Sequence, residues 1–555
     1  MGEFASIYRM KTKFKLIIAL VFLASTISFT LAKCGTPQAI REFYQGKEAR
    51  IQPDLALSFG SEHFLIHYDT VGTNAVYAAD IDSNTIPDYV ESTAVYSEYA
   101  WHIVVDSLGY RPPLPDSIEL TNPDEYGGDT RMDVYLSAMA LTHDAYGMTC
   151  HRVVINDGIS RKATAYTIIQ PDMTIFDNYS SNPYPALAVT CAHEFYHTVQ
   201  FAYNYPESFG GMDEWWMEAT AVFNEELCFD SVNDYYVYLP IFQNAPETPL
   251  FTYDDDENIW YGGVMLPIFL AEYFASDERR FSAEVLRLIW ESCETTNPRQ
   301  AIETFLADSG ITMQQALQEF TLWRTRVDSF WHGGLFAEGK NYPLPDMHRV
   351  DLTGGEFYAD DNLRALSCRL YQLPYEWKEN GIVGEITDID FGIEAWLQFI
   401  PIEAPGESMV NDTIGFLDEQ LSIEGRWQYP SLIFVLMAYN CPAYADISIR
   451  IAETDSLAVE LPEAHIFKNV YPNPCFGELT FEFDIGPPTN ICIQIFNSAG
   501  EAVWDTTASY LFTGSAEINW NCRNYSGKTL ATGVYVYIIT AGEQHKQGKF
   551  LLISG

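Results

Sequence analysis

Positive charge is scarce in this chain of 555 residues: 31 lysines and arginines stand against 76 aspartates and glutamates, a formal net charge of −45. A surface of that sign repels phosphate backbones and anionic lipid headgroups, which disfavours nucleic acid and membrane surfaces as partners. Long apolar runs are scarce too. The run at residues 16–31 is N-terminal and follows three closely spaced lysines. That arrangement is typical of a signal peptide, so we expect cleavage near Ala32 and no membrane span in the mature chain.

The C-x-x-C pair of cysteine-based zinc sites and thioredoxin-like motifs is also absent. Ten cysteines are present, and an even number in an exported protein predicts some disulfides, whose pairing the sequence leaves open. Cys34 has three interpretations: a lipidated N-terminus, which Lys33 disfavours, a disulfide partner, which is favoured, or a thiol that caps a metal and keeps an enzyme latent.

What is present suffices for several folded cores, since hydrophobic residues make up 47% and aromatic residues 15% of the chain. These fractions exclude a disordered chain, and the length predicts three or four domains. We expect a signal peptide over residues 1–32, a lead-in or pro-segment over 33–60, a catalytic domain over 61–345, a β-sandwich over 346–460 and a small β module over 465–555.

Local patterns place elements inside these domains. Strands are predicted at 64–68, 133–138 and 165–170, and helices at 89–108, 186–202, 214–227, 261–276, 281–293, 298–308 and 313–329. Short apolar or alternating segments follow from about residue 350, among them 395–399 and 432–437.

The strongest chemical signal is His193-Glu194-Phe195-Tyr196-His197, within the 186–202 helix. Two histidines four residues apart lie one turn apart on one helix face, so both imidazoles can bind one Zn²⁺. Glu194 then lies beside the metal, in position to take a proton from an attacking water.

A catalytic zinc site needs a third protein ligand and one open position. Glu218, in the next predicted helix and 21 residues after His197, is favoured over Asp213 and Glu214, which lie at the helix start. Glu225, seven residues further on, either hydrogen-bonds a ligand histidine or forms a solvated salt bridge.

A-H-E-F-Y-H-T-V-Q-F followed by W-W-M-E-A-T-A resembles the gluzincin metalloproteases, and more closely a little-characterised family of secreted bacterial metalloproteases, over about residues 60–330. The resemblance implies His193, His197 and Glu218 as zinc ligands and Glu194 as the catalytic base. The chain departs from thermolysin-like proteins at Val222, where those carry an acidic residue.

Two further roles follow from that resemblance. An edge strand that holds extended substrate is expected at residues 165–170, although an ordinary core strand is an equal alternative there. Tyr261, at the start of a predicted helix, matches the placement of an oxyanion-stabilising tyrosine, although tyrosines more often simply pack.

A second metal site is predicted at residues 80–91. Oxygen ligands recur there at the spacing of an EF-hand loop: the side chains of Asp80, Asp82, Asn84, Asp88 and Glu91, and the carbonyl of Ile86. Thr85 replaces the usual glycine and no entering helix precedes the loop, so it resembles the half EF-hand of dockerins. The alternative is an acidic surface turn that precedes a helix.

The last residues, about 465–555, contain Y-P-N-P, I-x-I-F-N-x-x-G, W-N, N-x-x-G and G-V-Y-V-Y in that order. This order resembles the C-terminal sorting domain of the type IX secretion system, which implies export through the periplasm and outer membrane with that machinery as a partner. Considered without the family, the segment is a small β-sandwich of unknown role.

Together these features predict an α+β zincin-like catalytic domain, with a mixed sheet, an active-site helix and a helical subdomain, followed by all-β sandwich domains. The predicted function is a secreted or cell-surface zinc endopeptidase that needs Zn²⁺ and Ca²⁺ and acts on a protein or peptide substrate. The alternatives are a non-catalytic adhesion or binding protein on a zincin scaffold, and a zinc hydrolase that acts on something other than peptides.

Overall fold

The computed structural model describes residues 34–553 apart from 47–51, 116–117, 119, 121–126, 144, 157, 159, 208–211, 253–257, 276–279, 283, 332, 334, 353, 375–380, 390–392, 403–415, 418–419, 424–430, 442, 455–468, 486–488, 511–513 and 542–543. The predicted signal peptide and its cleavage site at Ala32 lie outside the described residues. Within them, no helix is both long and apolar enough to cross a membrane.

Contacts within the chain divide it into two compact units. The first contains residues up to 210, 221–234 and 293–295, and the second contains 211–220, 235–292 and 296 onward. Helix α5 (Met212–Phe229) is one continuous helix whose residues are shared by both units.

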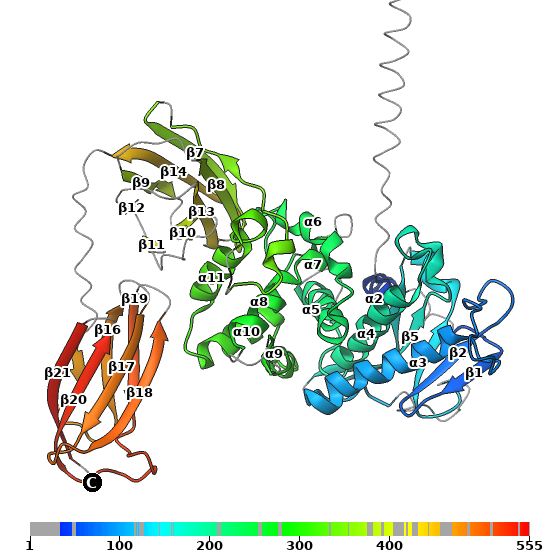
Figure 1. Ribbon diagram of the computed structural model, residues 1–555, viewed down its shortest axis with the longest axis horizontal. Coiled ribbons are helices and arrows are strands. Elements are labelled where there is room, and N and C mark those ends of the chain that lie inside the picture. The colour runs from blue at the N-terminus through cyan, green and yellow to red at the C-terminus, as the bar shows by residue number, and fades with distance from the viewer. Residues whose placement is uncertain are drawn as a thin grey trace, which may run out of the picture. The chain divides into compact units, whose positions relative to one another are not determined.

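The first unit is built on a five-stranded mixed sheet in the order β1-β2-β3-β5-β4 (Figure 1). Its strands are β1 (Leu57–Gly60), β2 (Phe64–Tyr68), β3 (Met132–Leu136), β4 (Gly147–Asn156) and β5 (Arg161–Ile169). The pairs β2–β3 and β3–β5 are parallel, whereas β1–β2 and β4–β5 are antiparallel. The sheet therefore begins four residues before the domain start predicted at residue 61.

Helices pack against this sheet. They are α2 (Thr36–Tyr44), α3 (Asp88–Trp101), its π-helical continuation η1 (His102–Ser107), and α4 (Tyr184–Phe201). Helix α4 contacts β4, β5 and α3, and every residue from Ala186 to Phe201 is buried. Apart from Glu194, residues 186–201 carry no carboxylate, lysine or arginine, so most of the helix surface can be buried without loss of charge hydration. Pro185 lies in the first turn, where its missing N–H leaves no bond unmade.

The structure corrects the edge strand expected at residues 165–170. Those residues end β5, which is paired on both sides, with β3 and with β4. The edge strands are β1 and β4, and the sequence analysis assigned the residues of neither to a strand. Strand order depends on pairing between distant segments, and an apolar run such as 165–170 has the same pattern at an edge as in the interior.

The second unit begins with short helices. They are α6 (Leu239–Gln243), α7 (Ile259–Gly262), α8 (Met265–Tyr273), α9 (Val285–Ser292), α10 (Pro298–Asp308) and α11 (Met313–Thr325). The helix predicted over 261–276 is interrupted at Gly263, where α7 ends. Asn297 and Thr312 cap α10 and α11, each accepting a backbone N–H through its side chain.

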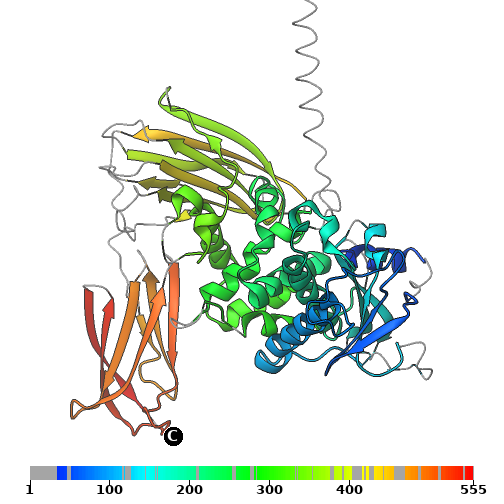
Figure 2. The ribbon, with the colours of Figure 1, turned by 45° about the vertical axis from the view of Figure 1, so that its right-hand side comes forward.

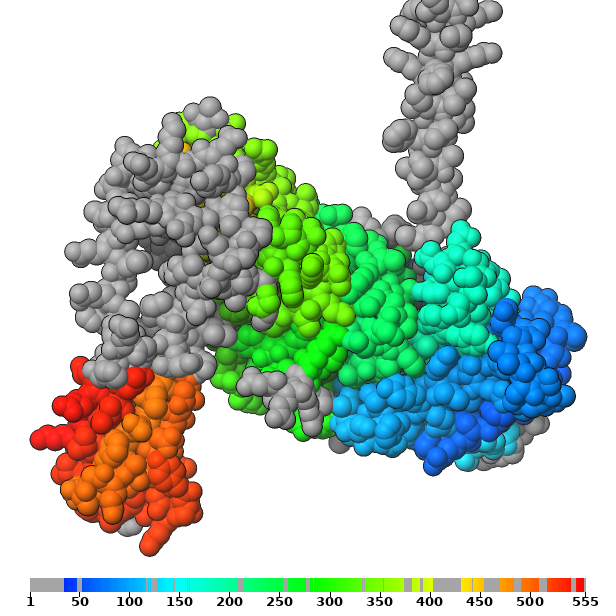
Figure 3. Space-filling model, in the orientation of Figure 1, coloured from blue at the N-terminus to red at the C-terminus, as the bar shows by residue number. Residues whose placement is uncertain are grey.

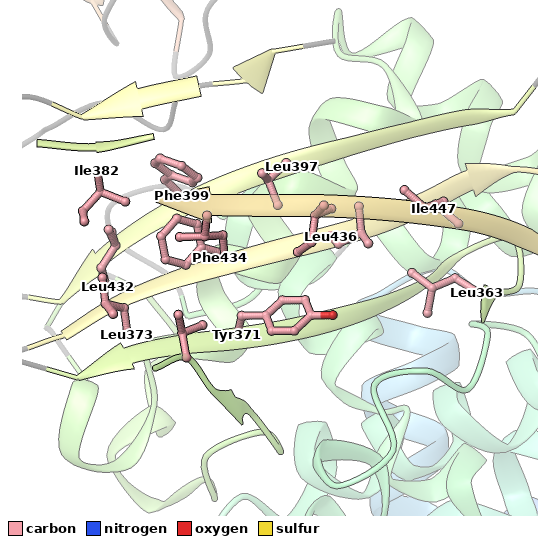
Figure 4. Packing of buried hydrophobic residues seen from close by; sticks show 14 of the residues in the cluster. Leu363, Tyr371, Leu373, Ile382, Leu397, Phe399, Leu432, Phe434, Leu436 and Ile447 are labelled. Carbon is pink, nitrogen blue, oxygen red and sulfur yellow. The ribbon is translucent and has the colours of Figure 1, made fainter. Parts of the chain in front are cut away.

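Two sheets follow in the same unit, in the orders β11-β10-β13-β8-β6 and β12-β9-β14-β7. Their strands are β6 (His348–Arg349), β7 (Glu356–Leu363), β8 (Ser367–Pro374), β9 (Gly381–Ile389), β10 (Glu394–Ile402), β11 (Phe416–Leu417), β12 (Gln420–Ile423), β13 (Ser431–Asn440) and β14 (Ala445–Thr454). Phe399, Phe434 and Leu436 point into the shared apolar core (Figure 4). Strand β13 is apolar on both faces because helix α11 also borders this sheet: Gln398 Nε2 donates to the carbonyl of Gln318 at 3.1 Å.

The C-terminal residues form a module with its own core. Its two sheets have the orders β15-β16-β19 and β18-β17-β20-β21. The module is coloured orange to red in Figure 2 and in Figure 3. Its strands are β15 (Asn469–Tyr471), β16 (Leu479–Ile485), β17 (Thr489–Phe496), β18 (Ala502–Tyr510), β19 (Gly514–Trp520), β20 (Gly533–Ala541) and β21 (Gln544–Leu552). Phe481, Ile493 and Trp520 are among its buried residues.

Candidate metal centre

The two histidines of the H-E-x-x-H motif lie on one face of α4. The ring centroids of His193 and His197 are 4.8 Å apart, and both residues are buried. Glu218 of α5 and Cys34, which precedes α2, complete a group of four in which each residue offers one ligand atom and all these atoms lie within 4.8 Å of one another. All four side chains are buried.

Hydrogen bonds fix the orientation of both imidazoles. Nδ1 of His193 lies 2.6 Å from Oε1 of Glu225, and Nδ1 of His197 lies 2.7 Å from Oε1 of Gln200. With Nδ1 engaged in each ring, Nε2 is the nitrogen available to a metal. Glu225 is buried rather than solvated, so of the two sequence-based alternatives it takes the one in which it bonds a ligand histidine.

Helices α4 and α5 are also tied directly at this point. Asn224 Nδ2 donates to the backbone carbonyl of Ala192 at 2.9 Å. Asn224 lies one residue before Glu225, and Ala192 lies one residue before His193. The bond therefore fixes the turn of α5 that carries Glu225 against the turn of α4 that carries His193. Both partners are buried, which makes the bond costly to break.

The carboxylate of Glu194 is held by two hydroxyl groups. Its Oε2 accepts hydrogen bonds from Thr149 Oγ1 at 2.8 Å and from Thr36 Oγ1 at 3.1 Å. Gly147 allows this approach, because a Cβ there would lie only 2.8 Å from Cγ of Glu194. Strand β4 therefore passes within contact distance of the predicted base.

The donor set fits Zn²⁺. Two imidazole nitrogens, a carboxylate oxygen and a sulfur are ligands that zinc accepts in a tetrahedral site, and a buried cluster of this kind is unusual without a metal. Cys191 also lies on α4 but is not in this group of four. Burial raises the pKa of its thiol to about 12, so Cys191 stays a neutral core residue. Nothing in this geometry shows which metal is bound.

Sequence reasoning missed Thr36, Thr149 and Gln200, and it gave the metal-capping role of Cys34 less weight than a disulfide. Thr149 had no signal, because its contact with Glu194 spans 45 residues. Gln200 was visible as the residue three after His197, one helical turn on. Cys34 was favoured as a disulfide partner, but the structure places its Sγ 3.3 Å from Nε2 of His197. All ten cysteines are among the described residues, and none forms a disulfide.

Tyr261 lies in α7, in the second unit. It is buried, and its ring packs against those of Tyr238 and Trp260 at centroid distances of 4.9 and 5.6 Å. These are contacts of a core tyrosine. Its role as an oxyanion donor stays a prediction.

The predicted calcium loop precedes α3, and three of its carboxylates converge. Asp80, Asp82 and Asp88 each offer an oxygen within 4.8 Å of the others. Thr85, in the position of the usual glycine, has φ of +76°, a left-handed conformation that strains a β-branched residue. Oδ1 of Asp80 accepts from the backbone N–H of Asn84 at 3.1 Å.

The remaining predicted ligands border this group. Glu91, in the first turn of α3, accepts from Asn84 Nδ2 at 2.9 Å, and Oδ1 of Asn84 accepts from the N–H of Ile86 at 2.8 Å. Asn84 thus links Glu91 to the loop, while Glu91 is not in the converging group. Whether the loop binds calcium stays a prediction.

Comparisons with known proteins bear mainly on the C-terminal module. No curated protein matches the chain. Among solved structures, PorZ, a surface component of the type IX secretion system of Porphyromonas gingivalis, is 20% identical over 21% of this chain and 15% of its own, with a TM-score of 0.15. Latent PorU from the same organism is 12% identical over 35% and 20%, with a TM-score of 0.16.

The adhesin domain of Epf from Streptococcus pyogenes is 12% identical over 39% of this chain and 85% of its own, with a TM-score of 0.15. The chain spans no more than a fifth of PorZ or PorU. At these TM-scores none of the three likenesses carries an argument about function.

A family model does match the last module: residues 469–553 fit the secretion system C-terminal sorting domain. The strands β15 to β21 lie within this range. The sorting domain implies contact with the type IX secretion machinery and export to the cell surface or the medium. The chain therefore carries, over residues 469–553, a C-terminal sorting domain of the type IX secretion system.

Proposed function

We propose that the exported chain is a zinc-dependent endopeptidase of gluzincin type. The observation that carries this proposal is the buried group of His193, His197 and Glu218. Glu194 lies between the two histidines in the sequence of the same helix. A purely structural metal site has no need of a carboxylate placed beside its ligands, whereas hydrolysis does.

Bound Zn²⁺ would act as a Lewis acid on the scissile carbonyl and lower the pKa of a water molecule. The chain's own residues supply the rest. Glu194 takes the proton of the attacking water and passes it to the leaving amine, and the Thr149 hydroxyl holds the carboxylate through the 2.8 Å bond to Oε2. Glu225 and Gln200 keep His193 and His197 in the tautomer that presents Nε2.

Strand β4 is the proposed substrate-binding strand. It is an edge of the sheet, and it passes Glu194 at Gly147 and Thr149. An edge strand pairs with the backbone of an extended peptide whatever its sequence, which suits an endopeptidase. Tyr261 is kept as the candidate oxyanion donor on the family resemblance.

The calcium loop is proposed as a stabilising site. Asp80, Asp82 and Asp88 repel one another without a cation, and α3, which follows the loop directly, packs against α4. Calcium would convert that repulsion into coordination.

One observation favours the alternative of a non-catalytic surface protein. With Cys34 included, the group has four protein donors, and closed four-ligand sites are typical of structural zinc. The proposal and this alternative differ in whether Cys34 is displaceable.

Metal analysis combined with casein turnover tests the proposal. The chain recovered from the medium should contain about one zinc per molecule, and Glu218→Ala should lose most of it. Glu214→Ala, one turn earlier on α5, is the matched control and should keep the metal. Absence of zinc from the wild-type chain would reject the zinc endopeptidase, and so would casein turnover that is detected and persists when Glu218→Ala is introduced.

A further inference from the structure

Three consecutive residues, Cys34, Gly35 and Thr36, contact every part of the candidate active site. We propose that they form an autoinhibitory segment, with the Cys34 thiolate as a displaceable fourth zinc ligand, so that the chain is exported in a latent form. This inference rests on the proposed function and concerns the regulation of the same site.

Cys34 occupies the position that catalysis needs open. Its Sγ lies 3.3 Å from Nε2 of His197, and its ligand atom is within 4.8 Å of those of His193 and Glu218. The backbone N–H of Thr36 donates to the same sulfur at 3.3 Å, which helps to hold the sulfur in place. Cys34 is 4% exposed, so substrate cannot reach the metal past it.

Thr36 covers the base. Its hydroxyl donates to Oε2 of Glu194 at 3.1 Å and accepts from the backbone N–H of Thr149 at 2.7 Å. Thr36 is fully buried. The Thr36 hydroxyl therefore lies directly against the carboxylate that an attacking water must also reach, and it competes with the water for that carboxylate.

Gly35 covers the edge strand. Its N–H donates to the carbonyl of Gly147 at 2.8 Å, and Cys34 pairs with Gly147 as a parallel bridge. These are the backbone groups that an extended substrate would use on β4. A Cβ on Gly35 would lie 2.7 Å from Cε and 3.1 Å from Cβ of Met148, so a larger residue would fit only if the Met148 side chain moved.

The combination separates an inhibitory role from a structural one. A permanent structural ligand would account for Cys34 alone. It would not account for Thr36 on the base or for Gly35 on the strand edge. Three adjacent residues that block the metal position, the base and the peptide-binding edge together are what an intramolecular inhibitor requires.

The segment is held by packing that can be undone. Helix α2 begins at Thr36, the last residue of the segment. Ala39 and Ile40 of this helix are buried, and Ala39 belongs to a cluster that includes Met148 and Tyr166. If the signal peptide is removed near Ala32, the segment is joined to the rest of the chain only on its C-terminal side. A cut between α2 and β1 would then leave it attached by non-covalent contacts alone, from which it can dissociate.

Cobalt substitution tests the ligand without relying on activity. The full exported chain, with residues 34–46 verified by intact mass, is loaded with Co²⁺ and its absorption spectrum recorded. We expect a thiolate-to-cobalt charge-transfer band in the wild-type chain but not in Cys34→Ala. Cys191→Ala, which removes a different buried thiol on α4, is the control and should keep the band. A wild-type spectrum without the band, or a band that persists in Cys34→Ala, overturns the proposal.

A second measurement uses the wild-type chain alone, so its result does not depend on whether Cys34→Ala folds. Cys34 of the zinc-loaded wild-type chain should resist a maleimide and become labelled after 1,10-phenanthroline removes the metal, as mapped by peptide mass. Equal labelling before and after chelation overturns the proposal.

Displaceability is measured with a small hydroxamate that binds zinc. Removing the competing thiolate should tighten hydroxamate binding about tenfold or more in Cys34→Ala, because the binding-competent fraction rises. If Cys34→Ala instead loses the metal, Cys34 is a structural ligand and the proposal fails.

The two proposals fail differently. Tighter hydroxamate binding by Cys34→Ala with no casein turnover would keep the inhibitory contact and reject the endopeptidase. Equal casein turnover by the intact wild-type chain and by Cys34→Ala would keep the endopeptidase and reject latency.

Discussion

Oε1 of Glu225 lies 2.6 Å from Nδ1 of His193, and both side chains are buried. Glu225 and Glu218 are seven residues apart on α5, two turns along one face, so one helix presents both a metal ligand and the residue that orients another ligand. A carboxylate on Nδ1 fixes the ring and makes Nε2 a better donor.

Glu225→Gln should therefore weaken zinc binding by about 10–100-fold while leaving the fold intact, because the amide keeps the shape and loses the charge. Competition with a chromogenic zinc chelator measures the change. Asp230→Asn, an exposed position just beyond α5, is the control. Unchanged zinc affinity in Glu225→Gln would mean that the bond does not tune the metal.

Glu194→Gln should abolish peptide hydrolysis and keep zinc. The amide still accepts the Thr149 and Thr36 hydroxyl bonds but cannot take a proton, so turnover should fall about 10²–10⁴-fold. Casein turnover in the Cys34→Ala background, together with zinc content, measures this. Near-normal turnover would remove Glu194 from the role of base.

The parts of the site that sequence predicted are those fixed by one helix or by helix-to-helix spacing. His193 and His197 share a face because α4 is regular, and Glu218 follows at a distance that lets a second helix return. The EF-hand spacing likewise indicated Asp80, Asp82 and Asp88 before their convergence was seen. Local geometry constrains such patterns without knowledge of the fold.

The parts that sequence could not predict depend on long-range contacts. Cys34 and His197 are 163 residues apart and Thr36 and Glu194 are 158 apart. The edge position of β4 likewise depends on which strands pair. The family resemblance suggested residues 165–170 as the edge strand, and their apolar pattern could not decide between that and the equal alternative of a core strand.

Calcium should raise the melting temperature of the first unit, since it binds only the folded loop. At free calcium a hundred times the dissociation constant the gain is about 2.7 kcal/mol. Asp82→Asn should reduce this response, because Asp82 is one of the three converging carboxylates. Asp106→Asn, an exposed residue of η1, is the control. Identical melting curves in millimolar calcium and in a calcium-selective chelator would reject the site.

The helical part of the second unit should lose stability as the pH rises. Burial raises the pKa of Glu319 in α11 to about 7, with Arg326 opposing the shift, and burial raises that of Glu272 in α8 to about 7. The unfolded chain releases these protons near the ordinary glutamate pKa of 4.5, so between about pH 4.5 and about pH 7 the folded state binds more protons than the unfolded state. Unfolding then becomes easier by up to about 3 kcal/mol per group.

Glu319→Gln should flatten this slope by about half, because the amide does not titrate while Glu272 still does. Calorimetric melting between about pH 5 and about pH 7 measures it. Glu303→Gln, which removes a surface partner of Arg299, should leave the slope unchanged. A Glu319→Gln chain that loses stability with pH as steeply as the wild type would contradict the assignment.

The C-terminal module contains a pair of thiols that should form a disulfide in oxidising conditions. Sγ of Cys475 and Sγ of Cys522 are 3.1 Å apart and both residues are buried. Oxidised glutathione would accept the two electrons: one thiolate attacks it, the second thiolate attacks the mixed disulfide, and two glutathione thiols leave. Burial raises the pKa of Cys522, so the reaction should be slow and should accelerate as the pH rises.

Intact mass should show the loss of two hydrogens, and the module's melting temperature should rise, since closing a loop of this length contributes about 2–4 kcal/mol. Cys475→Ala should abolish both changes and Cys492→Ala, in the same module, should abolish neither. A wild-type chain that keeps both thiols after prolonged exposure to oxidised glutathione at alkaline pH would show that the pair cannot reach disulfide geometry.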